Sequence, residues 1–166
     1  MNIELLSQEY QVKKMEETDV PEVYALCMGN PMYYSYCPPG ATIDGIKNDM
    51  RMLPPGKKAE DKFYIGFYQE KTLIAVMDLI DGYPNQKTVF IGFFMMNQAV
   101  QGKGIGSNII TESCRYFKKA GFLKVGLGYA KGNLQSERFW LKNQFIKTGS
   151  ETQADGYVIV RMERQL

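Results

Sequence analysis

The sequence contains no histidine, and this absence excludes several kinds of chemistry at once. Ser-His and Cys-His nucleophile pairs and histidine-ligated zinc all require an imidazole. Any general base among the 166 residues must therefore be a carboxylate, a tyrosine, a lysine, a cysteine or water. Cysteine is also scarce: Cys27, Cys37 and Cys114 are an odd number without a Cys-x-x-Cys spacing, which indicates reduced thiols in a cytoplasmic protein.

Long apolar runs and a strong excess of charge are also absent. No segment is apolar over the length of a membrane span, and the N-terminal residues lack the apolar stretch of a secretory signal, so we expect no membrane association. Lys and Arg number 20 and Asp and Glu 18, and the formal net charge of +2 predicts no basic surface for nucleic acid. Hydrophobic residues make up 45%, an ordinary share, and we predict one domain over residues 1–166.

Hydrophobic periodicity and turn residues predict alternating strands and helices, and hence an α/β fold. We expect strands at residues 10–16, 62–69, 72–81, 88–97 and 123–130, and a final hairpin at 147–165. Helices are expected at 18–30, capped by Thr18 or Asp19, and at 42–53, 106–121 and 133–145. Residues 31–40, with three prolines and a glycine, are predicted to form a loop.

The segment VQGKGIGSNII, residues 100–110, carries three alternating glycines between an apolar strand and a helix. It is not a Walker A loop, because Asn97 stands where the first glycine belongs and no Ser or Thr follows Lys103. It is not a dinucleotide fingerprint either, because Ser107 replaces the third glycine. The pattern that fits is Gln-x-x-Gly-x-Gly, formed by Gln101, Gly104 and Gly106.

Such a turn directs several backbone N–H groups to one point, and the dipole of the following helix adds positive charge. Together they form an anion site suited to a pyrophosphate, to which glycines allow close backbone approach. A glycine-rich turn without a ligand is the alternative interpretation.

Two neighbouring segments strengthen the ligand interpretation. In KVGLGYA, Gly126 and Gly128 share one strand face, which indicates close approach by a ligand or backbone, or tight packing against a helix. In NLQSERFWLKNQF, Asn133, Ser136 and Trp140 share one helix face and can wall a narrow ligand. Otherwise Asn133 is a plain N-cap and Trp140 a core aromatic.

With this element order, MMNQAVQGKGIGSNII and NLQSERFWLKNQF resemble the two coenzyme motifs of the GCN5-related N-acetyltransferase (GNAT) superfamily, over about Thr88 to Phe145. The resemblance implies a mostly antiparallel mixed sheet of about seven strands, flanked by four helices and splayed between the fourth and fifth strands. It implies acetyl transfer from acetyl-CoA, without a metal, to a primary amine by direct attack in a ternary complex. The aromatic loop favours a small-molecule amine, and we expect a monomer or homodimer that binds neither nucleic acid nor membrane.

The resemblance also assigns coenzyme contacts. The strand before the glycine loop would bind pantetheine and the thioester carbonyl through its backbone, the loop would hold the pyrophosphate, and the later helix would line the pantetheine arm. The implied residues are Phe94, Met95, Met96, Gln101, Gly102, Lys103, Gly104, Ile105, Gly106, Ser107, Asn133, Ser136, Phe139 and Trp140.

Two positions depart from the family pattern. Phe90 stands where many relatives carry a glutamate base, and Trp140 where many carry a tyrosine acid. Because an indole N–H donates a hydrogen bond but does not give up its proton, Trp140 is expected to pack against the pantetheine arm. Asp78 and Asp81 remain as candidate bases, although Asp81 is also a turn residue and Asp78 can simply be on the surface. Water can also remove the proton.

Four tyrosines are candidates for the acceptor site, because their rings stack on organic substrates or bind cations. They are Tyr33, Tyr34, Tyr36 and Tyr83. Two rival functions remain: a catalytically silent acyl-CoA-binding sensor or regulatory module, kept open by the missing Glu and Tyr, and a nucleotide-binding switch, weakened by the missing Walker signature.

Overall fold

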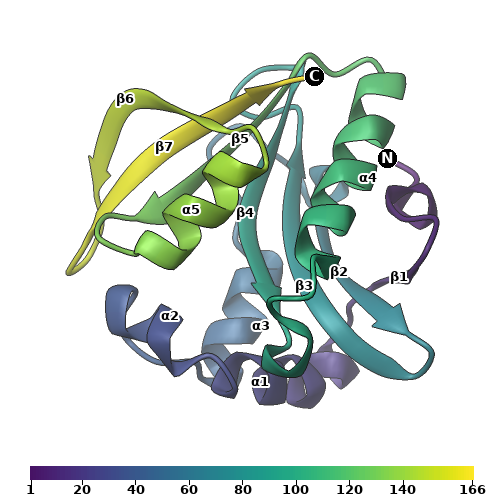
Figure 1. Ribbon diagram of the computed structural model, residues 1–166, viewed down its shortest axis with the longest axis vertical. Helices are drawn as coiled ribbons and strands as arrows, with labels where there is room; N and C mark the ends of the chain where they lie inside the picture. The colour runs from purple at the N-terminus through teal and green to yellow at the C-terminus, as the bar shows by residue number, and fades with distance from the viewer.

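A seven-stranded mixed sheet runs through the protein, whose computed structural model describes residues 1–166 (Figure 1). The strand order is β1-β2-β3-β4-β5-β7-β6, and every neighbouring pair is antiparallel except β4 and β5. The strands are β1 (Gln11–Lys14), β2 (Lys62–Gln69), β3 (Thr72–Asp81), β4 (Thr88–Met96), β5 (Lys124–Ala130), β6 (Ile146–Gln153) and β7 (Val158–Gln165). The predicted α/β fold with a mostly antiparallel mixed sheet is confirmed.

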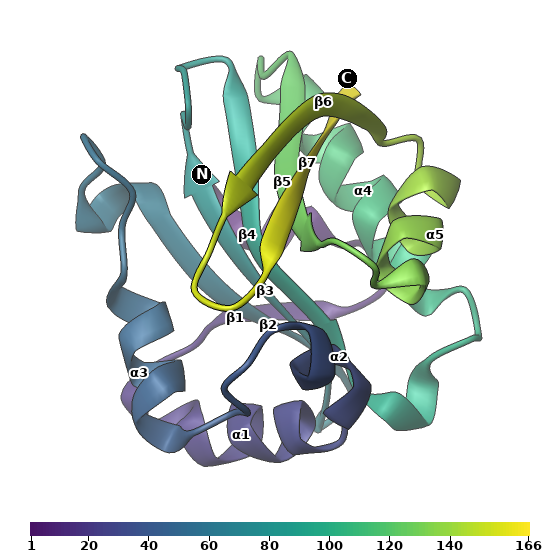
Figure 2. The ribbon, with the colours of Figure 1, turned by 90° about the vertical axis from the view of Figure 1, so that its left-hand side faces the viewer.

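Helices cover both faces of this sheet. They are α1 (Val20–Met28), α2 (Pro31–Tyr36), α3 (Ile43–Arg51), α4 (Ile105–Lys119) and α5 (Leu134–Lys142), with 3-10 turns η1 (Ile3–Leu6), η2 (Glu17–Asp19), η3 (Ala59–Asp61) and η4 (Gln98–Val100). Seen from the side in Figure 2, α1, α2 and α3 lie across the sheet from α4 and α5. The structure has one helix more than the four expected, because α2 forms where the sequence predicts a loop.

The helix α2 corrects the prediction of a loop at residues 31–40. Pro31 occupies the first turn, where a missing N–H is harmless and the fixed φ suits a helix. The other two prolines come only after the helix, and they end it because Cys37, before Pro38, is pushed out of helical geometry at φ −127°. The prolines therefore bound the helix instead of preventing it, because one stands in its first turn and two follow its end.

Most predicted helix ends are confirmed by their hydrogen bonds. Thr42 accepts the N–H of Gly45 at 2.9 Å at the start of α3. Gly121, at φ +90°, follows α4, and its N–H donates to the Lys118 carbonyl at 3.1 Å. Asp19 precedes α1 without capping it, because its carboxylate accepts the N–H of Glu16 at 2.9 Å and pairs with Lys13 at 2.8 Å.

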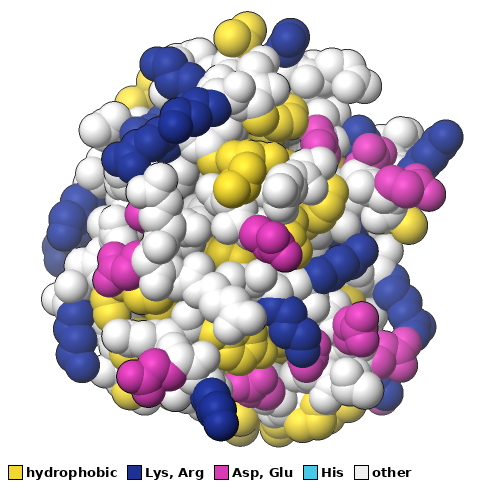
Figure 3. All heavy atoms as spheres, turned by 90° about the vertical axis from the view of Figure 1, so that its right-hand side faces the viewer, with side chains coloured by type: hydrophobic (Ala, Val, Ile, Leu, Met, Phe, Trp, Pro, Cys, Tyr) yellow, Lys and Arg dark blue, Asp and Glu magenta, His cyan; other side chains and the backbone are white.

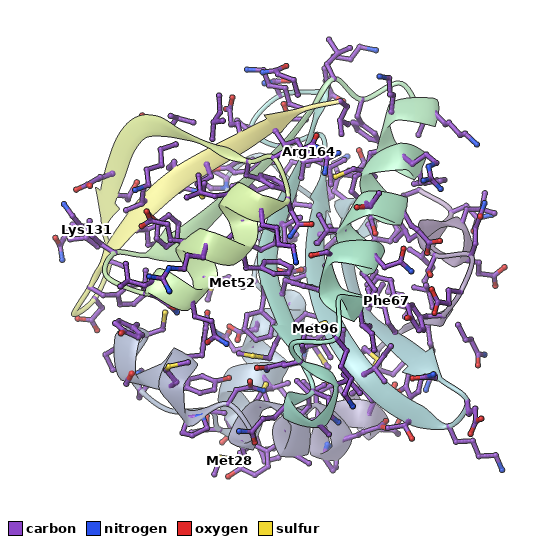
Figure 4. All side chains as sticks on the ribbon, viewed as in Figure 1. Met28, Met52, Phe67, Met96, Lys131 and Arg164 are labelled. Atoms are coloured by element: carbon purple, nitrogen blue, oxygen red, sulfur yellow. The ribbon has the colours of Figure 1, made fainter.

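Each helical layer encloses its own hydrophobic core. The larger core lies under α4 and α5 and includes the fully buried Phe67, Phe117 and Phe145; Phe67 is labelled in Figure 4. The smaller lies under α1 and α3 and includes Val23 and Ile46. Burying one such side chain stabilises the fold by about 1.5–3 kcal/mol, so both layers help to hold the helices on the sheet.

The parallel pair β4–β5 separates part of the way along its length. Thr88–Ile91 pair with Lys124–Leu127, but β4 continues to Met96 and β5 to Ala130 without further pairing to each other. The β3–β4 register shifts so that Gly92 is an unpaired extra residue, and such a bulge bends its strand. The predicted splay between the fourth and fifth strands is therefore confirmed.

The outer surface mixes charges of both signs. Figure 3 shows this on the side that carries β1 and α4, where lysine and arginine side chains alternate with carboxylates and small apolar areas. No helix combines the length and the apolar composition needed to cross a membrane.

Candidate active site

Two cavities meet where β4 and β5 separate. The first, which we call the loop cavity, has a volume of about 330 Å³ and lies among the glycine loop, the end of β4, α5 and residues 29–33. The second, the strand cavity, has about 260 Å³ and lies among β4, β5, β7 and Tyr157. Both are lined by Tyr33, Phe94, Asn133, Ser136 and Trp140. A larger hollow of about 470 Å³ against α1 carries none of the predicted site residues.

The glycine loop presents a run of free N–H groups. The backbone N–H groups of residues 102–107 donate to no acceptor in the protein, and no side chain caps α4. Gly102 at φ +75° and Gly104 at φ +83° adopt left-handed geometry, and no atom lies within 4 Å of where their Cβ atoms would stand. Because a 15-residue helix follows, its dipole adds positive charge at the same place. This geometry fits an anion such as a pyrophosphate.

A pair of amide side chains holds the loop against the end of β4. Gln101 Nε2 donates to Asn30 Oδ1 at 2.7 Å and to the Met96 carbonyl at 3.1 Å, and Asn30 Nδ2 donates to the same carbonyl at 3.0 Å. Sequence motifs pointed to Gln101 but not to Asn30. Asn30 precedes a proline and resembles an ordinary N-cap, yet it makes no capping bond.

The open edge of β4 carries unpaired backbone groups near the predicted thioester position. The Asn97 N–H donates across to Ile74 of β3 at 2.8 Å, so strand alternation directs the amide groups of Met96 and Phe94 to the opposite, open side. Asn30 and Gln101 occupy the Met96 carbonyl, which leaves the Met96 N–H available to a ligand. Figure 4 labels Met96 at the end of β4, beside the N-terminus of α4.

Helix α5 forms the opposite wall of the loop cavity. Asn133 Oδ1 caps it by accepting the Ser136 N–H at 3.0 Å. A Cβ on Gly106 would lie 3.2 Å from Phe139 Cε2, so this glycine is needed for close packing between α4 and α5. At the other end, Asn143 Nδ2 donates to Ser107 Oγ at 3.2 Å and fixes the first turn of α4 to α5.

Trp140 serves as both a core aromatic and a cavity wall. Only 6% of it is exposed, and its ring centroid lies 6.0 Å from Phe94, 5.0 Å from Phe139 and 5.1 Å from Phe145. It also lines both cavities. The two interpretations left open by the sequence therefore coexist in one side chain.

Of the four candidate tyrosines, only Tyr33 lines the cavities. Its ring meets those of Tyr34 at 5.0 Å and Phe93 at 5.7 Å, and burial raises the pKa of Tyr33 well above its usual range. Tyr34 packs on the smaller core, Tyr36 lies beside Gly132, and Tyr83 packs edge-on against Phe90 at 5.6 Å. None of these three tyrosines therefore lines either cavity.

Neither candidate base lines the loop cavity or the strand cavity. The alternative that Asp78 simply lies on the surface is wrong, since only 9% of it is exposed and Lys62 Nζ lies 2.8 Å from its carboxylate. Burial raises the pKa of Asp78, while the Lys62 ammonium opposes the shift. The bulge residue Gly92 leaves room for this pair, because a Cβ there would lie 2.6 Å from Asp78 Oδ2. Asp81 ends β3, and no Asp or Glu lines either cavity.

Positive side chains lie at both cavities, but not where the sequence indicated. Lys103 turns back and donates to the Ala99 carbonyl at 3.0 Å, and neither it nor Ile105 lines the loop cavity. Lys142, at the end of α5, lines that cavity instead. In the strand cavity, the Arg161 guanidinium lies 5.2 Å from the centre of the Phe90 ring.

Gly126 and Gly128 of β5 are close-approach positions, but the approaching groups are side chains of neighbouring strands. A Cβ on Gly126 would lie 3.3 Å from the Phe90 ring of β4, and one on Gly128 only 2.5 Å from Ile159 Cγ2 of β7. The sequence had suggested a ligand, another backbone or a helix. Gly128 itself still lines the strand cavity.

A splayed parallel pair with a free N–H loop at its mouth is the geometry expected of a GNAT acetyltransferase. A model of the Acetyltransferase (GNAT) family matches residues 30–145 of the sequence. The chain therefore belongs to the GNAT acetyltransferase family, as the sequence motifs indicated. No curated protein matches it in sequence. No group of three or more Cys, Asp and Glu side chains gathers where it could hold a metal ion.

Solved structures confirm the fold at low sequence identity. An acetyltransferase from Thermus thermophilus superimposes with a TM-score of 0.72 at 14% identity, covering 95% of this chain and 97% of its own. The ribosomal-protein-S18-alanine N-acetyltransferase of Escherichia coli gives 0.67 at 12% identity, covering 94% and 93%. The PaiA N-acetyltransferase of Thermoplasma acidophilum, solved in complex with coenzyme A, gives 0.67 at 17% identity, covering 95% and 99%.

Proposed function

We propose that the protein transfers an acetyl group from acetyl-CoA to the primary amine of a small molecule, and that residues 1–166 act as one catalytic domain. The observation that carries this proposal is the meeting of two cavities at the splay, one beside a free N–H loop and one bounded by strands. The first suits the coenzyme and the second suits an acceptor. A thioester at their junction would face both.

In this proposal the coenzyme lies along the loop cavity. The N–H groups of residues 102–107 hold the pyrophosphate, and Lys142 adds positive charge at the rim. The pantetheine arm follows the open edge of β4, where the Phe94 and Met96 amide groups are available, and packs against Trp140. The thioester carbonyl receives an N–H from β4, which stabilises the negative charge that develops as the amine attacks.

The amine attacks the thioester carbon directly from the strand cavity. A C–N bond forms, the C–S bond breaks, and the coenzyme leaves as a thiolate. Because a thiol with a pKa near 8.5 is a tolerable leaving group, a strong acid is not required. The amine proton passes to water, since no carboxylate lines the cavities and burial raises the pKa of Tyr33 and Tyr157, which keeps both phenols protonated.

The size of the strand cavity supports a small acceptor. Its volume of about 260 Å³ lies just below the roughly 300–1,000 Å³ typical of drug-sized ligands. Aromatic and aliphatic side chains make up most of its lining. Tyr33 and Phe93 close one side, so we assign Tyr33 a contact with the acceptor.

Thermal unfolding with coenzyme tests the first half of the proposal. Saturation at 100 times Kd should stabilise the protein by about 2.7 kcal/mol, which for a chain of this size raises Tm by roughly 5–11 °C. CoA and acetyl-CoA should both produce this shift. A larger shift with ATP or NAD would contradict the proposal and favour a nucleotide-binding protein.

Thiol release from acetyl-CoA with a panel of amines tests the second half. The missing carboxylate in both linings favours one alternative, a catalytically silent acyl-CoA-binding sensor or regulatory module. That module would show the thermal shift without amine-dependent thiol release. An N-acetylated product identified by mass spectrometry would establish the transferase.

A further inference from the structure

One charged side chain lines the strand cavity, and it is positive. Arg161 reaches the cavity from β7, where it is paired in register with Gly128 of β5. Its guanidinium lies over the Phe90 ring at 5.2 Å from the centroid. The rest of the lining is apolar, aromatic or uncharged.

Arg161 has no acidic partner in the protein. The seven ion pairs of the structure do not include it, and no protein acceptor receives a hydrogen bond from its guanidinium. Lysines of the neighbouring strands differ: Lys124 pairs with Glu163 at 3.0 Å, and Lys147 with Glu137 at 2.7 Å. The planar fork of Arg161, which has five N–H donors, is thus free to face a ligand.

This charge is unexpected for a site that takes only an amine. A primary amine is a cation in water, so a cavity built for a plain amine would place a carboxylate beside it. The coenzyme does not explain Arg161 either, because the pantetheine arm is uncharged and the free N–H groups for the pyrophosphate are in the other cavity. An acceptor that carries its own anionic group would satisfy the arginine.

We infer that the acceptor is a small amine that also carries a carboxylate, with an apolar portion, and that Arg161 binds this carboxylate. The inference rests on the proposed function and specifies its substrate class. A guanidinium matches a carboxylate with two parallel N–H···O bonds, which a lysine does not reproduce. The apolar portion of the acceptor would pack against Phe90, Phe93 and Ile159, which leaves its amino group to face the junction of the cavities.

Matched amines that differ only in the carboxylate test this inference. Phenylalanine would be compared with phenethylamine, and leucine with 3-methylbutylamine, in the wild type and in Arg161→Gln and Arg161→Lys. Arg115→Gln is the control, because it removes one positive charge from an exposed position on α4 outside both cavities. All four proteins would be tested at the same ionic strength with saturating acetyl-CoA.

The wild type should favour the carboxylated member of each pair in kcat/KM. Arg161→Gln should reduce that preference roughly 10- to 100-fold, mainly by raising KM for the carboxylated member. This is the factor expected for the loss of a charge-assisted pair. Arg161→Lys should restore only part of it, and Arg115→Gln should behave as the wild type. The KM for acetyl-CoA should not change in any variant. Equal use of both members by the wild type, or an unchanged preference in Arg161→Gln, would overturn the inference.

Product binding keeps the test independent of turnover. With CoA present, N-acetylphenylalanine should raise the Tm of the wild type and not that of Arg161→Gln, whereas N-acetylphenethylamine should have the same weak effect on both. If neither compound shifts Tm although CoA does, the carboxylate inference fails while coenzyme binding stands. If CoA itself has no effect, the proposed function fails.

Discussion

Replacing Gly104 by valine should separate the coenzyme function of the glycine loop from its role in folding. Gly104 stands at φ +83° immediately before α4, with no atom within 4 Å of a Cβ position. A valine side chain would clash with no neighbouring atom there, but a β-branched residue strongly disfavours that backbone geometry, at a cost of about 1–3 kcal/mol. In a chain of this size each kcal/mol lowers Tm by roughly 2–4 °C, so the variant should still fold.

The effect on coenzyme binding should be larger than the effect on stability. If the loop moves out of left-handed geometry, the N–H groups of residues 104–106 turn away from one another and no longer converge on the pyrophosphate. Losing two charge-assisted hydrogen bonds of about 1.5 kcal/mol each weakens binding by about 3 kcal/mol, or roughly 100-fold in Kd. Isothermal titration with CoA measures this change. Pantetheine, which lacks the pyrophosphate, should bind the variant and the wild type equally.

Gly56→Val is the matched control. Gly56 stands at φ +79°, also with no atom within 4 Å of its Cβ position, and lines neither cavity. It should lose a similar amount of stability and keep the wild-type affinity for CoA. A folded Gly104→Val protein with Kd for CoA within about threefold of the wild type would refute the assignment of the loop as a phosphate site.

Three further side chains at or near the site give separate tests. Trp140→Phe should keep most of the turnover, since no proton transfer is assigned to the indole, and a collapse of its kcat with CoA binding intact would contradict this. Trp140→Ala should lose about 3–5 kcal/mol of stability and bind CoA more weakly. Asp78→Asn should lower the free energy of unfolding in urea by about 3–5 kcal/mol, because it leaves the Lys62 ammonium buried without its partner. The double variant Lys62→Met/Asp78→Leu should recover most of that loss, and equal instability of the two variants would argue against an uncompensated charge. Cys37 should react with iodoacetamide more slowly than free cysteine at pH 7.5, because burial raises the pKa of its thiol; fast labelling, followed by mass spectrometry, would show an activated thiol. Because Cys37 lines the strand cavity, its alkylation should block amine turnover but not CoA binding.

The elements with strong local signals were predictable from the sequence. β2 and β3 begin and end where expected, because their apolar runs flank the turn at Glu70 and Lys71. The loop at 102–107 and the cap at Asn133 were also predictable, since both depend on the residues of one short segment. Helix α2 was missed because its first proline favours a helix and the later ones end it, a difference of position and not of composition.

Two residues of the strand cavity, Tyr157 and Arg161, were not predictable as site residues, because they reach the cavity only through long-range pairing. Tyr157 and Arg161 belong to a stretch that by pattern is an ordinary final strand. Their position depends on β7 lying between β5 and β6, which places Arg161 opposite Gly128. Asn30 was missed for the same reason, since its partners Met96 and Gln101 are distant in sequence.

The same pairing explains why glycine occurs at Gly128, in the middle of a strand. A Cβ there would lie 2.5 Å from Ile159 Cγ2, so any side chain would displace Ile159, a β7 residue that lines the strand cavity beside Arg161. The bulge at Gly92 has a related effect on the facing strand, because it bends β4 and leaves room for the Asp78 carboxylate behind it. The glycines of the loop leave N–H groups free for an anion, whereas those of the strands position neighbouring side chains. The free N–H groups of the loop are therefore encoded in one short segment, whereas the lining of the strand cavity depends on the topology of the sheet.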